Sequence, residues 1–161
     1  MLTPVPINYV TGDATNPLGP GKRIIAHCCN DAGFWNAGFV RALSERFHQP
    51  ERDYRRWARI LGRIPFRLGQ VQFVQVQPGL SVANIIGQSG IRSASNPTPI
   101  RYDSLREGLG RVRAQALEDD ATVHMPRIGA GLAGGDWQII SAIIEDELCF
   151  HGVNVTVYDL P

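Results

Sequence analysis

The chain alternates between segments with the apolar spacing of strands and segments with that of helices. Residues 70–77 alternate polar and apolar side chains almost perfectly, which predicts a strand with one face in water, near an edge of its sheet. Residues 23–28 form an apolar run that is typical of a strand buried on both faces. The pattern therefore predicts a sheet with a buried interior and a solvent-facing edge.

Apolar residues at helical spacing predict four helices, with short strands between them. The helices are expected at residues 39–47, 50–61, 102–117 and 137–148, the last one capped by Asp136 and ended by Gly152. Further strands are expected at residues 7–10, 80–88, 122–125 and 153–160. Because strands and helices intermix, we expect an α/β fold with helices on both faces of a largely parallel or mixed sheet.

Composition narrows the class of protein. At 161 residues, with 43% hydrophobic residues, the chain predicts one compact domain over residues 1–161 and a monomer. A net charge of +1 argues against a protein that grips nucleic acid by charge alone. No apolar run approaches the roughly 20 residues that a membrane span requires.

The cysteines predict neither a disulfide framework nor a metal site. There are three, Cys28, Cys29 and Cys149, an odd number that favours a reducing, cytoplasmic location. Adjacent residues on a strand point to opposite faces, so Cys28 and Cys29 cannot share a zinc ion. We expect no metal and no cofactor.

Small residues follow three of the expected strands, at residues 11–14, 30–38 and 129–135. Ligands of α/β sheets collect at the carboxyl ends of strands, where loops gather and helix N-termini present unpaired N–H groups. Glycine lets backbone N–H groups approach an anion closely. Neither the P-loop nor the dinucleotide fingerprint occurs. The three stretches therefore suggest a long anionic ligand containing a diphosphate.

The same stretches resemble a known family. "TGDAT", "IAHCCNDAGFWNAGFVRAL", "MPRIGAGLAGGDW" and "VTVYDL" occur in the order typical of the macrodomain family. The similarity is greatest to the branch that contains the terminal ADP-ribose protein glycohydrolase. The chain resembles a single macrodomain of the bacterial type. The resemblance implies a three-layer α/β/α sandwich with a mixed central sheet that holds ADP-ribose across the strand ends.

The resemblance also implies a role for each end of the ligand site. Asp13 would accept a hydrogen bond from the adenine amino group, and the Ala14 N–H would reach a ring nitrogen. Tyr158 and Leu160 would lie beside the adenine. The diphosphate and distal ribose would be held by the glycine loop and the start of the opposing helix, through Gly129, Ala130, Gly131, Leu132, Ala133, Gly38 and Phe39.

The chain departs from that branch at two catalytic positions, where Gln88 replaces a lysine and Ala133 replaces an aspartate. Glutamine cannot form a Schiff base, and the only lysine, Lys22, precedes the second strand at the far end of the sheet. Water attack on the anomeric carbon remains, aided by the phosphate of the substrate and positioned by Asn30, Gln88 and the main chain near Gly131.

Several residues carry two interpretations at this stage. Asp31 is a candidate acid or a turn residue, and Asp136 a replacement acid or a helix cap. His27 is a packed core histidine or a base. Phe34 and Trp35 are a lid or an anchor for their loop.

The function is also open between three classes. The first is a hydrolase that releases ADP-ribose from acidic side chains of modified proteins. A close relative of this first class is hydrolysis of another derivative, ADP-ribose 1″-phosphate or ADP-ribosylated nucleic acid. The second is a reader that binds ADP-ribose without cleavage. The third is contact of the arginine-rich residues 41–67 with nucleic acid or an acidic protein, although two solvated amphipathic helices are the simpler explanation of those arginines.

Overall fold

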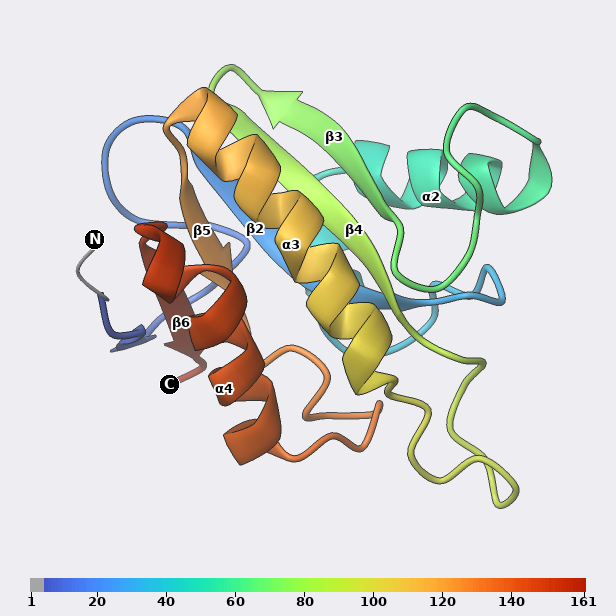
Figure 1. Ribbon diagram of the computed structural model, residues 1–161. Helices are drawn as coiled ribbons and strands as arrows, with labels where there is room; N and C mark the ends of the chain where they lie inside the picture. Colours follow the sequence, from blue (N-terminus) through green and yellow to red (C-terminus); the bar gives the residue numbers. More distant parts are fainter. Residues whose placement is uncertain (1–4) are drawn as a thin grey trace.

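The computed structural model describes residues 5–161 as a sheet between two layers of helices (Figure 1). Six strands form the sheet in the order β1-β6-β5-β2-β4-β3. Their bounds are β1 Asn8–Thr11, β2 Arg23–Asn30, β3 Val71–Gln77, β4 Leu80–Gln88, β5 Thr122–Met125 and β6 Val155–Asp159. This three-layer α/β/α sandwich with a mixed sheet confirms the expected fold class.

The strands are parallel except for β3, which runs antiparallel to β4 at one edge of the sheet. Gly79 turns the chain between these two strands with φ +74°, a backbone conformation that glycine adopts without strain. The alternating pattern of β3 thus correctly predicts an edge strand. Its polar residues Gln75 and Gln77 are exposed, whereas Val71 and Val74 are buried.

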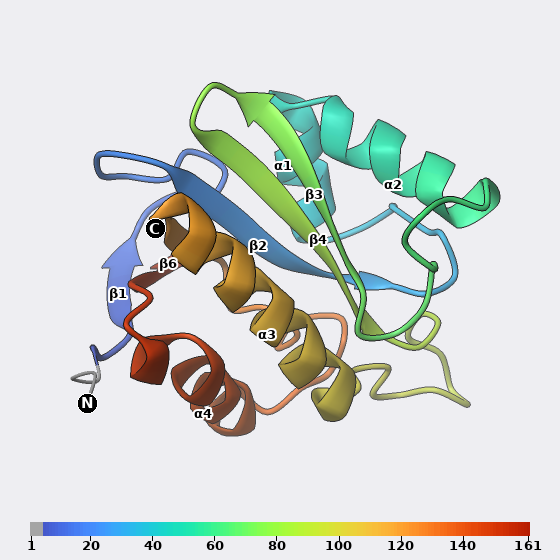
Figure 2. The ribbon, with the colours of Figure 1, turned by 45° about the horizontal axis from the view of Figure 1, so that its top comes forward.

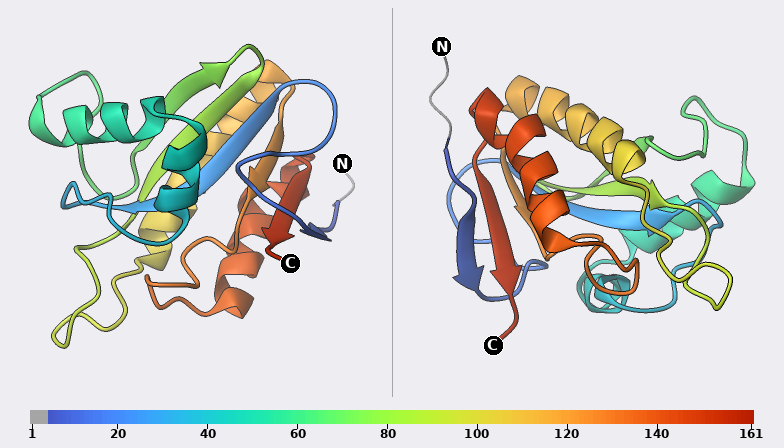
Figure 3. Two further views of the ribbon diagram at one scale, coloured as in Figure 1. Left: turned by 180° about the vertical axis from the view of Figure 1, so that it is seen from behind. Right: turned by 60° about the horizontal axis from the view of Figure 1, so that its bottom comes forward.

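Two helices cover each face of the sheet, as the two views of Figure 3 show. α1 (Phe39–Arg46) and α2 (Gln49–Arg59) cover one face, and α3 (Tyr102–Asp119) and α4 (Trp137–Glu147) cover the other. Neighbouring residues of β2 serve the two cores, because Ile25 packs in the cluster with Leu43 and Tyr54 while Ile24 packs in the cluster with Leu109 and Ile144.

Some element ends differ from the expectation. β2 continues through Cys29 and Asn30, which we placed in a loop, because they pair with Ile86 and Gln88 of the long strand β4. α4 ends at Glu147, and Gly152 instead ends the short 3₁₀ turn η1 (Cys149–His151) with φ +80°. The Asp136 cap is confirmed, since its Oδ1 accepts a hydrogen bond from the Gln138 N–H at 2.8 Å.

The five parallel strands have their carboxyl ends at the same edge of the sheet. The loops after β2, β4 and β5 come together at this edge (Figure 2). This is the edge at which ligands of α/β sheets bind. None of the helices within residues 5–161 is long and apolar enough to cross a membrane.

Candidate functional site

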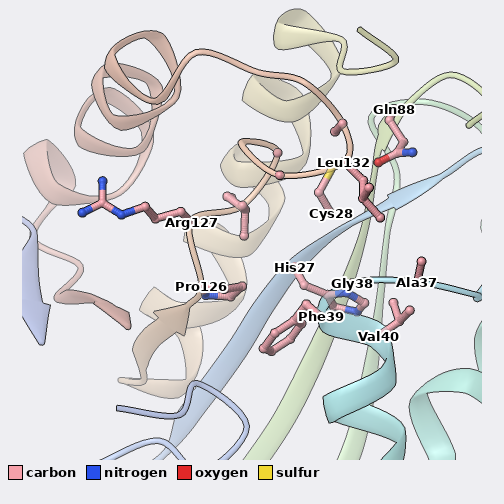
Figure 4. A pocket seen from close by; sticks show the side chains of 14 residues that line it. His27, Cys28, Ala37, Gly38, Phe39, Val40, Gln88, Pro126, Arg127 and Leu132 are labelled. Carbon is pink, nitrogen blue, oxygen red and sulfur yellow. The ribbon is translucent and has the colours of Figure 1, made fainter. Parts of the chain in front are cut away.

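A cleft opens at the carboxyl ends of β2, β4 and β5 (Figure 4). Its first cavity, of about 170 Å³, lies between the glycine loop after β5 and the start of α1. A second cavity, of about 240 Å³, continues beyond Gln88 toward the turn that contains Ile91 and Arg92. The two cavities share Cys28, Ala37, Val40, Gln88 and Leu132, so they form one continuous cleft.

The glycine loop keeps its shape through two close approaches of the backbone. The Gly135 N–H bonds to the Gly129 carbonyl at 2.7 Å, and a Cβ atom at Gly135 would lie 2.6 Å from that oxygen. Gly129 has φ +71° and is packed against Ile100 and Ile140. At Gly131, in contrast, a Cβ atom would have no neighbouring atom within 4 Å, because it would face the open cavity.

Residues with unpaired main-chain N–H groups line the first cavity on both sides. Within the described chain the N–H groups of Gly131, Leu132 and Ala133 make no hydrogen bond, and all three residues line this cavity. Gly38 begins α1 on the opposite wall with φ +80° and without a side-chain cap, which leaves the first N–H groups of the helix free. This pair of walls is suited to an anion.

Ala130 is the exception among the expected loop residues. Its N–H already bonds to the Arg127 carbonyl at 3.3 Å, and Ala130 does not line either cavity. The sequence could not distinguish it from its neighbours, because the direction of each N–H depends on the turn geometry.

The residues expected at the adenine end lie next to the first cavity, at the ends of β1 and β6, and do not line it. Asp13 accepts hydrogen bonds on Oδ1 from the Thr15 N–H at 2.8 Å and the Thr15 hydroxyl at 2.7 Å. Although partial burial acts to raise the pKa of Asp13, the Thr15 bonds and the nearby Arg46 hold that pKa below its ordinary value. Asp13 is therefore an ionised acceptor.

Tyr158 and Leu160 differ in their surroundings. Tyr158 is buried, and its hydroxyl contacts the Leu18 N–H at 2.9 Å and His124 Nδ1 at 2.7 Å. Leu160 is 79% exposed and free to cover a bound group. Ala14 is buried in the turn beside Asp13.

Arg127 ties the glycine loop to β1 and β6, at the end of the cleft where adenine is expected, a role that the sequence did not reveal. Figure 4 shows its side chain directed away from the first cavity. Its guanidinium binds both carboxylate oxygens of Asp159, at 2.7 and 3.0 Å, and lies 5.2 Å from the Tyr9 ring and 5.1 Å from the Trp137 ring. Trp137 begins α4, so both ends of the glycine loop meet at this guanidinium. A lone arginine inside a glycine-rich loop was the available signal.

The candidate catalytic residues have unequal access to the cleft. Gln88 lines both cavities, and its Nε2 donates to the Gly90 carbonyl at 3.1 Å. Asn30 lines the second cavity, but its Oδ1 already accepts from the N–H groups of Ala32 and Phe34 and from the Tyr54 hydroxyl. Asn30 thus shapes the loop that follows β2.

Asp31 lines neither cavity, because its Oδ1 accepts the Gly90 N–H at 2.8 Å and holds two loops together. With Asp136 engaged as a helix cap, no carboxylate lines either cavity in residues 5–161. The charged residues among the described lining are Arg127, whose guanidinium is bound to Asp159 and directed away from the first cavity, and Arg92, which is the cation open to a ligand. The cleft is therefore suited to an anionic ligand and offers no carboxylic acid for proton transfer.

His27 forms the floor of the first cavity and is also a packed core residue. Its ring is 2% exposed, lies 5.3 Å from the Trp35 ring, and bonds through Nε2 to Asn84 Oδ1 at 2.5 Å. Burial lowers the pKa of His27 to about 4, although the Asn84 bond acts to raise it. The ring is therefore neutral at pH 7 and a weak base.

The neighbouring thiols are unreactive. Burial raises the pKa of Cys28 to about 12, and Cys28 and Cys29 pack on opposite faces of β2, as the strand geometry predicts. Across residues 5–161, His, Cys, Asp and Glu side chains form no group of three that could hold a metal ion.

Phe34 and Trp35 have separate roles. Trp35 is buried, and its indole N–H donates to the Ser44 hydroxyl at 2.8 Å, so it anchors the loop. Phe34 is 47% exposed and lines the second cavity.

The arginine-rich residues 41–67 are partly paired. Ion pairs join Arg46 to Asp13, Arg52 to Asp53 and Arg55 to Glu51. Arg41, Arg56, Arg59, Arg63 and Arg67 form no ion pair within the described chain. Contact of this face with nucleic acid or an acidic protein stays a prediction.

Two known proteins have sequences similar to nearly the whole of this chain. No family model matches the chain. The chain is 34% identical to the ADP-ribose glycohydrolase OARD1 of Homo sapiens, over 96% of this chain and 91% of that protein. It is 30% identical to the chromodomain-helicase-DNA-binding protein 1-like of Mus musculus, but spans 18% of the length of that protein.

Solved structures show the same fold. A macrodomain protein from Streptomyces coelicolor is 50% identical, with a TM-score of 0.85 over 95% of this chain and 98% of that one. The macrodomain of Thermus aquaticus DarG has a TM-score of 0.73 over 95% of this chain and 97% of that one, and at 19% identity it supports the fold alone. From the glycine loop, the strand order and these relatives together, the chain belongs to the macrodomain family.

Proposed function

We propose that this protein binds ADP-ribose in the cleft and hydrolyses the ester that joins ADP-ribose to acidic side chains of proteins. One observation carries the proposal: residues with unpaired N–H groups, at Gly131–Ala133 and at the start of α1, line the two walls of a cavity without a carboxylate. The human relative is named an ADP-ribose glycohydrolase, which supports the same ligand.

The ligand would lie along the strand ends. Its adenine would meet Asp13, the Ala14 N–H and the side chains of Tyr158 and Leu160, and its diphosphate would lie between the glycine loop and Gly38–Phe39. The distal ribose would then reach Gln88, where the first cavity opens into the second. The ionised carboxylate of Asp13 favours adenine, because it accepts from an amino group and repels a carbonyl oxygen.

Covalent catalysis by lysine is not available. Lys22 precedes β2, and Cys28 at the cleft lies six residues further along this strand, which is roughly 20 Å at the rise of an extended chain. The nucleophile in our proposal is therefore water, held near Gln88 and the main chain of Gly131. Asn30 would act indirectly by shaping the adjacent loop.

The hydrolysis needs little proton transfer from the protein. The water oxygen bonds to the anomeric carbon, the bond from this carbon to the ester oxygen breaks with its electron pair, and the water proton passes to a phosphate oxygen of the ligand. A glutamate or aspartate leaving group has an ordinary pKa of about 4 and departs as a carboxylate without an acid. A serine hydroxyl would need protonation. The cleft without a carboxylic acid thus favours the ester linkage.

The test uses two substrates that differ in linkage. Proteins carrying ADP-ribose on glutamate and on serine are incubated separately with the protein, and released ADP-ribose is measured. We expect release from glutamate and none from serine. Release from serine alone would contradict the mechanism. Calorimetric binding of ADP-ribose without release from either substrate would select the second candidate, a reader, which the absence of a carboxylate in the described cleft also supports.

The expected location also remains a proposal. Cys28, Cys29 and Cys149 are free thiols in the structure, which supports a reducing, cytoplasmic environment.

A further inference from the structure

The second cavity lies where the group attached to ADP-ribose must leave the cleft. In the proposed function, on which this inference rests, the anomeric carbon reaches Gln88, and Gln88 lines both cavities. The adenine end lies in the other direction, beyond the first cavity. In that arrangement the conjugated group would lie toward the second cavity.

The lining of the second cavity is mostly apolar and amide, with a single charge. Phe34 and Ile91 are exposed at its rim, at 47% and 49%. Asn30, Asn36 and Gln88 contribute amides, and Arg92 contributes the only charge among the described lining residues. Such a surface offers apolar contact and hydrogen bonds to a peptide backbone.

Arg92 is a free cation on a well-held turn. The Gly90 N–H bonds to Asp31 Oδ1 at 2.8 Å, and Asn96 Nδ2 donates to the Ser89 carbonyl at 2.7 Å and the Ile91 carbonyl at 3.1 Å. Within residues 5–161 the Arg92 guanidinium forms no ion pair with any carboxylate. Its neighbours thus fix the turn and leave the charge available to a ligand.

We propose that the second cavity binds the protein segment that carries ADP-ribose, and that Arg92 selects segments with an acidic residue next to the modified one. A single guanidinium matches one carboxylate, and a guanidinium binds a carboxylate in a planar, two-bond geometry. A nucleic-acid strand presents a row of phosphates and is usually bound by several cations. The cavity therefore favours an acidic peptide over nucleic acid.

The experiment compares two peptides that carry ADP-ribose on the same glutamate. One has an aspartate next to the modified residue and the other has an asparagine. Release of ADP-ribose is measured for the natural protein, for Arg92→Gln, and for Arg59→Gln, a control that removes another exposed arginine, outside the cleft. Binding of free ADP-ribose is measured for all three, with an ADP-ribosylated DNA oligonucleotide as a further substrate.

We expect the natural protein to prefer the aspartate peptide by about threefold to fivefold in kcat/KM, the size of an exposed ion pair. Arg92→Gln should remove this preference, Arg59→Gln should keep it, and 0.5 M salt should weaken it. Affinity for free ADP-ribose should stay the same in all three proteins.

Different failures identify different errors. If the natural protein does not bind free ADP-ribose, the proposed function is wrong. Normal binding and release with equal rates on both peptides would overturn the role of Arg92 alone. A larger effect of Arg92→Gln on the DNA substrate than on the peptides would overturn the choice of a protein segment.

Discussion

The two ends of the cleft are built in opposite ways. At the end proposed to bind adenine, Asp13 is bonded to Thr15, and Arg127 joins the glycine loop to Asp159, Tyr9 and Trp137. At the other end, Arg92 has no carboxylate partner in the described chain, and Phe34 and Ile91 are exposed. The first end is organised before a ligand arrives, whereas the second leaves its groups free. This difference suits a ligand with one constant part and one variable part.

Lowering the pH should reduce the free energy of unfolding, because two buried histidines lie close to the first cavity and to Tyr158. This is the largest effect that we expect. Burial lowers the pKa of His27 and of His124 to about 4, and His124 bonds to Tyr158 at the adenine end. Each neutral ring stabilises the fold fully above pH 6.5, and this contribution is lost as the pH falls from 6.5 toward 4. The free energy of unfolding should drop by about 3 kcal/mol for each histidine over this interval.

Urea denaturation at a series of pH values measures this loss. A His124→Gln variant, which retains hydrogen-bonding groups but cannot titrate, should lose about 3 kcal/mol less stability than the natural protein between pH 6.5 and 4. If the free energy of unfolding depends on pH equally in both proteins, His124 takes up no proton when the protein unfolds in this pH range.

Blocking the first cavity should abolish binding without unfolding the protein. A side chain at Gly131 enters open space, so Gly131→Phe should fold normally and weaken ADP-ribose binding more than a hundredfold. Gly62→Phe is the matched control, since the nearest atom there is 4.0 Å away and Gly62 lies outside the cleft. Calorimetry and thermal melting check both. Retained affinity in Gly131→Phe would place the ligand elsewhere.

Substitution of Gln88, which lies between the two cavities, should lower the rate of hydrolysis much more than the affinity for ADP-ribose. Gln88→Ala should lower kcat about tenfold while the affinity for ADP-ribose changes less than twofold, because the proposed role of Gln88 concerns the attacking water. Single-turnover rates and calorimetry measure the two quantities. An equal loss in both would make Gln88 a binding residue instead.

Arg127 should show the smallest effect, because it acts on the ligand only through the glycine loop. Arg127→Ala removes the Asp159 pair and both ring contacts, and should weaken ADP-ribose binding about fivefold. Arg127→Lys keeps the charge and should recover part of the affinity. Lack of any recovery, together with a lower melting temperature in both variants, would indicate a role in folding alone.

The sequence predicted what depends on local pattern. The alternation at Val71–Gln77 revealed an edge strand, the spacing after Tyr102 revealed α3, and Asp136 revealed the start of α4. Gly129 and Gly131 revealed a loop with little side chain. These features depend on residues close together along the chain, so periodicity and capping rules suffice for them.

Features that depend on distant residues could not be predicted. Arg127 contacts Tyr9, which lies far away along the chain and is brought near only by the pairing of β1 with β6. The engagement of Asp31 with Gly90 depends on the two loops meeting, which turned a candidate acid into a tether. The extension of β2 to Asn30 likewise depends on the length of its partner β4.

The two glycines at positions 131 and 135 should respond differently to random substitution. At Gly135 a side chain would collide with the Gly129 carbonyl, so no other residue fits whether or not the protein is required to act. At Gly131 the space is open, so many residues fit when only folding is demanded. In a library of variants selected first for folding and then for activity, intolerance at 135 would appear in the first round and intolerance at 131 only in the second. The difference between the two rounds would locate the ligand site without any ligand-bound structure.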